Sequence, residues 1–204
     1  MSNNAIAVMA SGKGSNLRVI LDAVAAGTCP VEVKLVISDK ADAQALNIAR
    51  AAGVPQVLHL DPKAYADRAS FDVDCAEVID AAGCQWIVLA GYMRILSSSF
   101  VRHFRGRMIN IHPSILPAFP GAKAVEAALG YGVKASGCTV HLVDEILDGG
   151  PILAQAVVPV LDGDTLESLH ARIQVEEHRL YPATLARMVT TGFDIDGRRV
   201  IWRT

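Results

Sequence analysis

Residues 108–121 read Met-Ile-Asn-Ile-His-Pro-Ser-Ile-Leu-Pro-Ala-Phe-Pro-Gly, an apolar strand that runs into a proline-rich exit. Asn110 and His112 lie two positions apart, so a strand presents both side chains on the same face. Pro113 lacks a backbone donor and favours an extended conformation at His112. An amide donor beside an imidazole at a strand end can stabilise and protonate an oxyanion. The stretch therefore predicts a buried strand that ends in a polar, chemically capable pair.

Short apolar strands alternate with helical segments along most of the chain. This alternation predicts an α/β fold with a mostly parallel, twisted sheet and helices on both faces. The predicted strands cover residues 6–9, 31–38, 56–59, 86–90, 110–112, 138–143 and 152–160, and a hairpin covers 193–202 with its turn at 196–197. The predicted helices cover residues 17–26, 42–52, 61–82, 97–104 and 122–129, with a long one from a cap at Asp164 or Thr165 to 189. The later strands lack intervening helices, which predicts antiparallel strands toward the C-terminal half.

The bulk composition suits one domain over residues 1–204. The chain is 51% hydrophobic and 20% charged, with a formal net charge of -2. The lack of a basic excess argues against a nucleic-acid partner. No apolar segment is long enough to cross a bilayer, and the first apolar run has no basic flank, so we expect a cytoplasmic protein without a membrane partner. The four cysteines are scattered, which predicts buried thiols in a reducing compartment.

A glycine-rich turn, Ser-Gly-Lys-Gly-Ser-Asn at residues 11–16, separates the first predicted strand from the first helix. Glycines allow close approach of the backbone, and a helix N-terminus attracts anions. The run lacks the Lys-Ser/Thr pair of a Walker motif and the third glycine of a dinucleotide fingerprint, so it predicts a monophosphate site. The alternative is a tight turn in which Ser15 or Asn16 simply caps the helix.

The loop at 144–151 reads Asp-Glu-Ile-Leu-Asp-Gly-Gly-Pro and lies between two predicted strands. Asp148 either bonds to its own turn in an Asx-type arrangement or orients an imidazole and balances its charge. Together with Asn110 and His112 it predicts polarisation of a carbonyl and proton transfer. The sequence carries no activated-nucleophile motif and no metal-ligand spacing. The substrate should therefore supply the nucleophile, as in acyl transfer to an amine.

These motifs resemble those of the phosphoribosylglycinamide formyltransferase family, along nearly the whole chain. The resemblance rests on residues 11–17, 90–96, 110–117 and 147–151, supported by Glu177-His178 before Tyr181-Pro182. It implies a formyltransferase fold and 10-formyltetrahydrofolate as co-substrate, with no metal. It also implies the amine of glycinamide ribonucleotide as acceptor, within de novo purine synthesis. We expect a monomer or homodimer.

The resemblance also implies roles for individual residues. The catalytic residues would be Asn110, His112 and Asp148, and the ribonucleotide would be held by Gly14, Ser15, Asn16, Gln174 and Glu177. The folate would be held by Met93, Arg94, Ile95, Leu96, Asn110, Asp144 and Asp148, with Arg68 toward its glutamate tail. Residues 1–100 would form the nucleotide-binding half and 101–204 the folate-binding and catalytic half. The Leu116-Pro117 bond would be cis, whereas residues 118–124 lack the basic or histidine residues of some relatives.

Several alternatives stay open. A formyltetrahydrofolate hydrolase uses the same donor with water as acceptor, although such enzymes carry an extra regulatory domain and lack the glycine-rich turn. A non-catalytic nucleotide-binding module would share the fold, because α/β sheets host many functions. From the residues alone, 93–96 is either a pocket wall or core with a surface arginine. His141, in an apolar strand, is expected to be structural.

Overall fold

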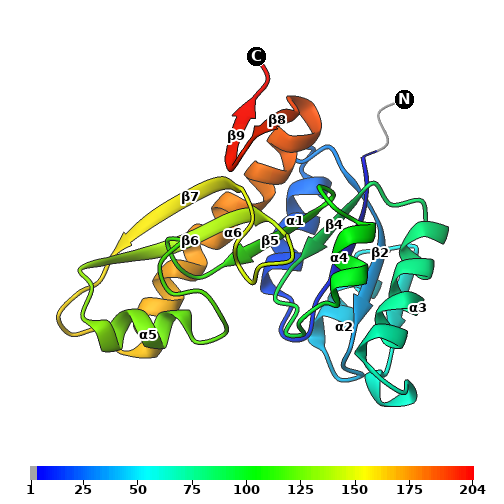
Figure 1. Ribbon diagram of the computed structural model, residues 1–204, viewed down its shortest axis with the longest axis horizontal. Coiled ribbons are helices and arrows are strands. Elements are labelled where there is room, and N and C mark those ends of the chain that lie inside the picture. The colour runs from blue at the N-terminus through cyan, green and yellow to red at the C-terminus, as the bar shows by residue number, and fades with distance from the viewer. Residues whose placement is uncertain (1–3) are drawn as a thin grey trace. The chain divides into compact units, whose positions relative to one another are not determined.

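The computed structural model describes residues 4–204, and the chain divides into two compact units whose boundary follows Ile109 (Figure 1). Seven strands form a sheet in the order β3-β2-β1-β4-β5-β6-β7, and β8 and β9 form a separate pair. The pairs β1–β2, β1–β4 and β2–β3 are parallel, while β6–β7 is antiparallel. The predicted α/β fold, with antiparallel strands toward the C-terminal half, is confirmed. The single domain and the functions of its two halves stay predictions.

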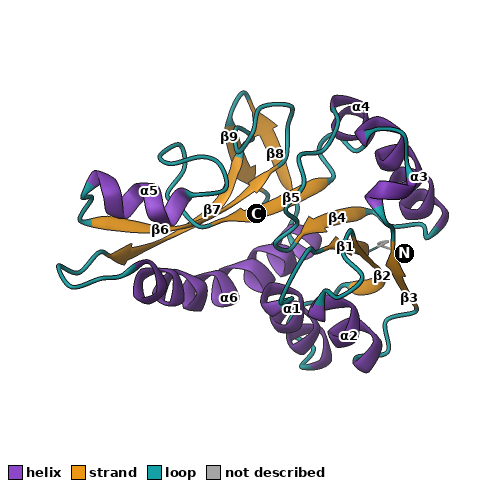
Figure 2. Cartoon of the chain, turned by 90° about the horizontal axis from the view of Figure 1, so that it is seen from below, coloured by secondary structure: helices purple, strands orange, loops and turns teal. Residues whose placement is uncertain are grey.

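The first unit is an open parallel arrangement of strands and helices. Its elements are β1 (Ala5–Met9), α1 (Ser15–Ala25), β2 (Glu32–Ser38), α2 (Gln44–Ala51), β3 (Gln56–His59), the 3-10 turn η1 (Pro62–Ala64), α3 (Arg68–Ala81), β4 (Trp86–Leu89) and α4 (Ser98–His103). Figure 2 shows α1 and α2 on one face of these strands and α3 and α4 on the other. Every residue of β1 is buried, as expected for a strand covered on both faces.

The helix predicted over 61–82 is wrong as a single element. The structure has the short turn η1 and then the separate helix α3. Asp67 caps α3, because its Oδ1 accepts the N–H of Ser70 at 2.8 Å while the Ser70 hydroxyl faces the Asp67 N–H. This reciprocal cap starts a new helix where the apolar spacing alone indicated continuity.

The second unit packs two antiparallel strands between helices. From β5 (Met108–His112) the chain continues through α5 (Ala124–Tyr131), β6 (Ala135–Leu142), β7 (Ile152–Pro159), α6 (Leu166–Thr190), β8 (Phe193–Asp196) and β9 (Arg199–Trp202). Figure 2 shows α5 and α6 on opposite faces of β6 and β7. Thr165 is the N-cap of α6 and forms a capping box with Ser168, which decides between the two predicted caps. The predicted hairpin at 193–202 is confirmed.

Strand β6 begins before the predicted start at 138. Ser136 and Gly137 have little strand propensity, yet they pair with Val158 and Val157 of β7 and are buried. Tertiary pairing therefore overrides local preference here.

The four cysteines are free and buried, as predicted. Burial raises the pKa of Cys75 and of Cys138 to about 12, so these thiols are protonated at neutral pH. Across residues 4–204, none of the helices combines the length and the apolar character that crossing a membrane requires.

Candidate active site

Asn110 and His112 lie at the C-terminal end of strand β5, in the second unit. Met108, Ile109 and Ile111 are buried, while Asn110 keeps part of its surface exposed. The imidazole of His112 is only 6% exposed. A buried polar side chain needs partners, so the surroundings of these two residues decide their chemistry.

Both ring nitrogens of His112 face oxygen atoms. Nδ1 lies 3.4 Å from Oδ2 of Asp148, and Nε2 lies 2.9 Å from the carbonyl oxygen of Phe119. A carbonyl can only accept, so Nε2 carries a hydrogen and donates to Phe119. The Asp148 side chain is only 8% exposed, and its charge therefore acts on the ring with little screening by water. The structure thus brings His112 and Asp148 together.

The loop that carries Asp148 is tightly built. Asp148 adopts a positive φ of 52°, which is uncommon for a residue other than glycine, and its Oδ2 accepts the Gly121 N–H at 2.7 Å. A Cβ on Gly150 would overlap the Leu142 carbonyl, so the second glycine is required. The Asp148 carboxylate accepts an N–H from outside its own turn, whereas Asp144 forms an Asx-type bond in this loop, because it accepts the Ile146 N–H at 2.9 Å. The aspartate at 148 therefore points its carboxylate toward β5.

His141 completes a group that the sequence did not reveal. Its Nε2 lies 3.2 Å from Nδ2 of Asn110 and 3.7 Å from Oδ1 of Asp148. Its Nδ1 lies 2.8 Å from the carbonyl oxygen of Leu142, and burial lowers its pKa. We call Asn110, His112, His141 and Asp148 the polar cluster. The one sequence signal for His141 was its alternation with Thr139, which places two polar side chains on one face of an apolar strand.

The segment after β5 is fixed to β6 and β7. Thr139 Oγ1 donates to the Ser114 carbonyl at 2.7 Å and accepts the Leu116 N–H at 3.1 Å. Gln155 Nε2 donates to the Leu116 carbonyl at 2.8 Å. The Leu116-Pro117 bond is cis, which confirms the implication of the resemblance. This bracing holds the chain beyond His112 in one path toward Phe119.

Gln174 and Glu177 lie one turn apart on α6. Glu177 is 5% exposed, and a buried carboxylate is costly unless it is paired or used. Burial and then the charge of Glu177 raise the pKa of Tyr181 well above its ordinary value. These two predicted ribonucleotide contacts therefore belong to the same unit as the polar cluster, on a different element.

The predicted phosphate turn lies in the first unit. Gly14 is the N-cap of α1 with a φ of 70°, and a Cβ there would lie 2.7 Å from Cα of Ala45. The alternative in which Ser15 or Asn16 is the cap is wrong, because α1 begins at Ser15 and no side chain caps it. The first turn also carries no acidic residue. Its backbone donors are therefore suited to an anion.

Residues 93–96 form an exposed apolar segment after β4. Met93 is 70% and Ile95 is 63% exposed, whereas the Arg94 guanidinium lies 4.8 Å from the Phe71 ring centroid. The alternative, in which the apolar residues of this segment belong to the core and Arg94 lies at the surface, is wrong. Met93 and Ile95 are exposed, whereas Arg94 is half-buried. Arg68, the first residue of α3, is exposed. Exposed apolar side chains at the end of a strand suit contact with a ligand.

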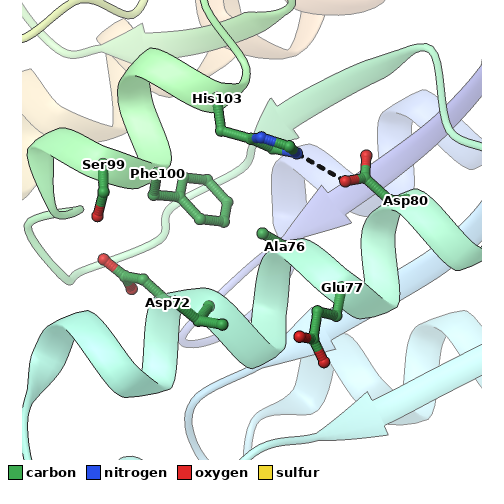
Figure 3. Close-up of a pocket in the computed structure, with 8 residues that line it drawn as sticks. Asp72, Ala76, Glu77, Asp80, Ser99, Phe100 and His103 are labelled. Carbon is green, nitrogen blue, oxygen red and sulfur yellow. Dashed lines mark hydrogen bonds and ion pairs between the residues drawn. The ribbon is translucent and has the colours of Figure 1, made fainter.

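A separate cavity of about 270 Å³ lies between α3 and α4 (Figure 3). His103 Nε2 lies 2.6 Å from Asp80 Oδ2 at its wall, and the buried Asp72 accepts the Ser97 N–H at 2.6 Å. The cavity contains none of the predicted site residues.

Known proteins match this chain along most of its length. Residues 4–185 match the family model described as formyl transferase. The chain belongs to the formyl transferase family. The phosphoribosylglycinamide formyltransferase of Mycobacterium tuberculosis is 47% identical over 193 residues, with 95% of this chain and 88% of that protein covered. The resemblance found in the sequence is therefore confirmed.

Solved structures agree with this assignment. Glycinamide ribonucleotide transformylase 1 of Symbiobacterium toebii superposes with a TM-score of 0.95 at 49% identity, covering 98% of this chain and 94% of that chain. The trifunctional purine biosynthetic protein adenosine-3 of Bos taurus is 40% identical over 200 residues. This chain spans only 20% of the length of that relative.

Proposed function

We propose that this chain transfers the formyl group of 10-formyltetrahydrofolate to the amine of glycinamide ribonucleotide, in de novo purine synthesis. The polar cluster carries the proposal. It gathers an amide donor, two imidazoles and a buried carboxylate, and Nδ1 of His112 lies 3.4 Å from Oδ2 of Asp148. These are the groups that a direct attack of an amine on a formyl carbon requires. The names of the full-length relatives support the same reaction.

In the proposed reaction, the amine nitrogen forms a bond to the formyl carbon and the bond from that carbon to the folate nitrogen breaks. Asn110 donates an N–H to the oxygen that becomes negative, and His112 donates a second. Asp148 balances the charge of the imidazole and relays the surplus proton of the amine through water to the folate nitrogen, which leaves as a neutral amine. The products are the formylated amine and tetrahydrofolate.

His112 can donate its Nε2–H to the substrate only if it gives up its present hydrogen-bond acceptor. The Nε2–H already donates to the Phe119 carbonyl at 2.9 Å, and Phe119 holds a positive φ of 53°. The substrate oxygen therefore has to replace this carbonyl as acceptor. In this proposal, the segment around Phe119 supplies a temporary partner that keeps the buried ring satisfied between turnovers.

The remaining predicted residues bind the two substrates. Gly14, Ser15 and Asn16 hold the phosphate through the N-terminus of α1, and Gln174 and Glu177 hold the rest of the ribonucleotide. The folate contacts Met93 to Leu96, Asn110, Asp144 and Asp148, with Arg68 toward its tail. We also propose a cytoplasmic monomer or homodimer, which light scattering on the purified protein would resolve.

The decisive experiment follows the ultraviolet absorbance of formyl-folate with purified protein, with and without glycinamide ribonucleotide. We expect loss of the formyl group only when the acceptor is present. Loss without acceptor would replace the transferase with a hydrolase. A formyltetrahydrofolate deformylase from Pseudomonas syringae superposes with a TM-score of 0.89, but its identity is only 27%. If the formyl group is lost neither with nor without the acceptor, the chain would be a non-catalytic nucleotide-binding module.

A further inference from the structure

The contacts of His141 specify where its proton lies. The ring is 2% exposed, and Nδ1 lies 2.8 Å from the Leu142 carbonyl oxygen. Since a carbonyl only accepts, Nδ1 carries the hydrogen. Nε2 faces Nδ2 of Asn110 at 3.2 Å, and an amide nitrogen only donates. Nε2 must therefore offer its lone pair, so the ring is neutral with its proton on Nδ1.

This tautomer also sets the orientation of the Asn110 amide. The lone pair on Nε2 accepts from an amide nitrogen and repels an amide oxygen. One N–H of Asn110 is used by His141, which leaves the second N–H of the same nitrogen to donate elsewhere. The direction of the oxyanion donor is thus determined by a residue that lies 31 positions away in the chain.

The backbone of β6 and β7 places His141 for this contact. The antiparallel register shifts between Val140 and His141, so that Val140 pairs with Ala154 while His141 pairs with Ile152. Irregularities of this kind re-aim a side chain and are common beside active sites.

We infer that His141 is a positioning residue for the formyl transfer, which holds the Asn110 carboxamide with its nitrogen in the donor position. This inference rests on the proposed function for its catalytic consequence, but the contact itself can be tested alone. Protonation of His141 would place an N–H against the amide nitrogen, and the amide would turn its oxygen toward the ring. The charged or titratable groups that act on the ring are Asp148, His112 and Asp144.

The first test observes the tautomer. Two-bond ¹H–¹⁵N spectra of histidine-labelled protein at neutral pH, assigned with His141→Gln, should show a neutral ring protonated on Nδ1. A ring protonated on Nε2, or on both nitrogens, would overturn the inference whatever the protein catalyses.

The second test measures turnover. His141→Phe removes the acceptor, and we expect kcat to fall about ten- to a hundredfold, with less than a twofold change in either KM. His141→Gln restores an oxygen acceptor and should recover part of the loss. His170→Gln, on the exposed face of α6, is the matched control and should keep wild-type turnover. If Gln and Phe at 141 cost the same, the inference fails, because the acceptor would not matter.

The third test separates positioning from simple structural damage. In an Asn110→Ala background, His141→Phe should cost no further activity, since the amide that it orients is absent. A further tenfold loss there would overturn the inference. Wild-type turnover of Asn110→Ala alone would instead contradict the catalytic role proposed for Asn110. The spectra of the His141 tautomer would then still test the contact between His141 and Asn110.

Discussion

Nδ1 of His112 lies 3.4 Å from Oδ2 of Asp148, and the same oxygen accepts the N–H of Gly121 at 2.7 Å. The carboxylate therefore joins the end of β5 to the segment that follows it. One charge both faces the proposed acid and anchors the chain beside that acid.

The charge of Asp148 can be removed with little change of shape. Asp148→Asn keeps an oxygen for Gly121 but cannot balance a protonated His112. We expect kcat to fall about a hundred- to a thousandfold, with small changes in either KM, in steady-state formyl transfer. Asp162→Asn, which removes the partner of an exposed Lys134 pair, should stay within about twofold of wild type. Turnover of Asp148→Asn within about tenfold of wild type would contradict the role proposed for the charge.

The C-terminal hairpin braces the loop that carries Asp148. Arg198 Nη2 donates to the carbonyl oxygen of Gly149 at 2.7 Å, from the turn between β8 and β9. We expect Arg198→Ala to lower kcat about 3- to 30-fold, because small displacements of a catalytic group are costly. Thermal unfolding should show a nearly unchanged Tm, since Arg198 is exposed.

Arg199→Ala is the matched control for this effect, because its side chain is the exposed neighbour of Arg198. It should keep wild-type kcat. Equal losses in the two variants would mean that the hairpin acts through its charge and not through the contact with Gly149.

The sequence predicted the fold because the strands and helices have strong local signals. The apolar runs of β1 and β4 and the prolines after His112 each specify local structure. The break between η1 and α3 was missed because the cap at Asp67 interrupts an otherwise helical pattern. Local spacing identified Asn110, His112 and Asp148 as candidates, and the structure placed them in one cluster.

Contacts between distant positions could not be predicted in the same way. His141 meets Asn110 only because β6 and β7 pair with a shifted register. Arg198 reaches Gly149 across 49 positions, through a hairpin whose sequence indicates a turn and nothing more. Such contacts depend on register and packing, which a single sequence does not specify.

Thr139 should stabilise the second unit through its hydroxyl. The side chain is buried and bonds to Ser114, Leu116 and Gln155. Thr139→Val keeps the shape and leaves those buried groups without this partner, so we expect the free energy of unfolding in urea to fall by about 2–4 kcal/mol. Thr139→Ser should recover much of it.

Thr190→Val provides the comparison, because the Thr190 hydroxyl donates to the Ala186 carbonyl on an exposed part of α6. The free energy of unfolding of Thr190→Val should lie less than about 0.5 kcal/mol below that of the wild type. A loss at Thr190 as large as at Thr139 would refute the bracing role.

Gly14 should be irreplaceable on steric grounds. Its φ of 70° disfavours any side chain, and an added Cβ would lie 2.7 Å from Cα of Ala45. We expect Gly14→Ala to destabilise the fold by about 2 kcal/mol or more and to raise KM for the ribonucleotide. Gly12→Ala has open space around the new methyl and should keep the wild-type Tm, which differential scanning calorimetry would check. An unchanged Tm for Gly14→Ala would show that the turn can relax.

The start of α6 should make the protein sensitive to acid. Arg172 donates to both oxygens of Asp164 at 2.8 and 2.9 Å, and these bonds, followed by the Leu161 N–H, hold the pKa of Asp164 well below its ordinary value. A carboxyl whose pKa is depressed by folding stabilises the native state above its unfolded pKa of about 4, and this contribution is lost as the pH falls through the folded pKa. Arg172→Gln removes the main cause of the depression.

We therefore expect Arg172→Gln to be less stable than wild type at pH 7, with a difference that narrows as the pH falls below about 4. Urea midpoints measured at several pH values would show it. Arg179→Gln, which breaks an exposed pair with Glu176 on the same helix, is the control and should follow the wild-type profile. A gap between Arg172→Gln and wild type that stays constant down to strongly acid pH would mean that Arg172 stabilises α6 by packing, because only a charge interaction disappears when the carboxylate is protonated.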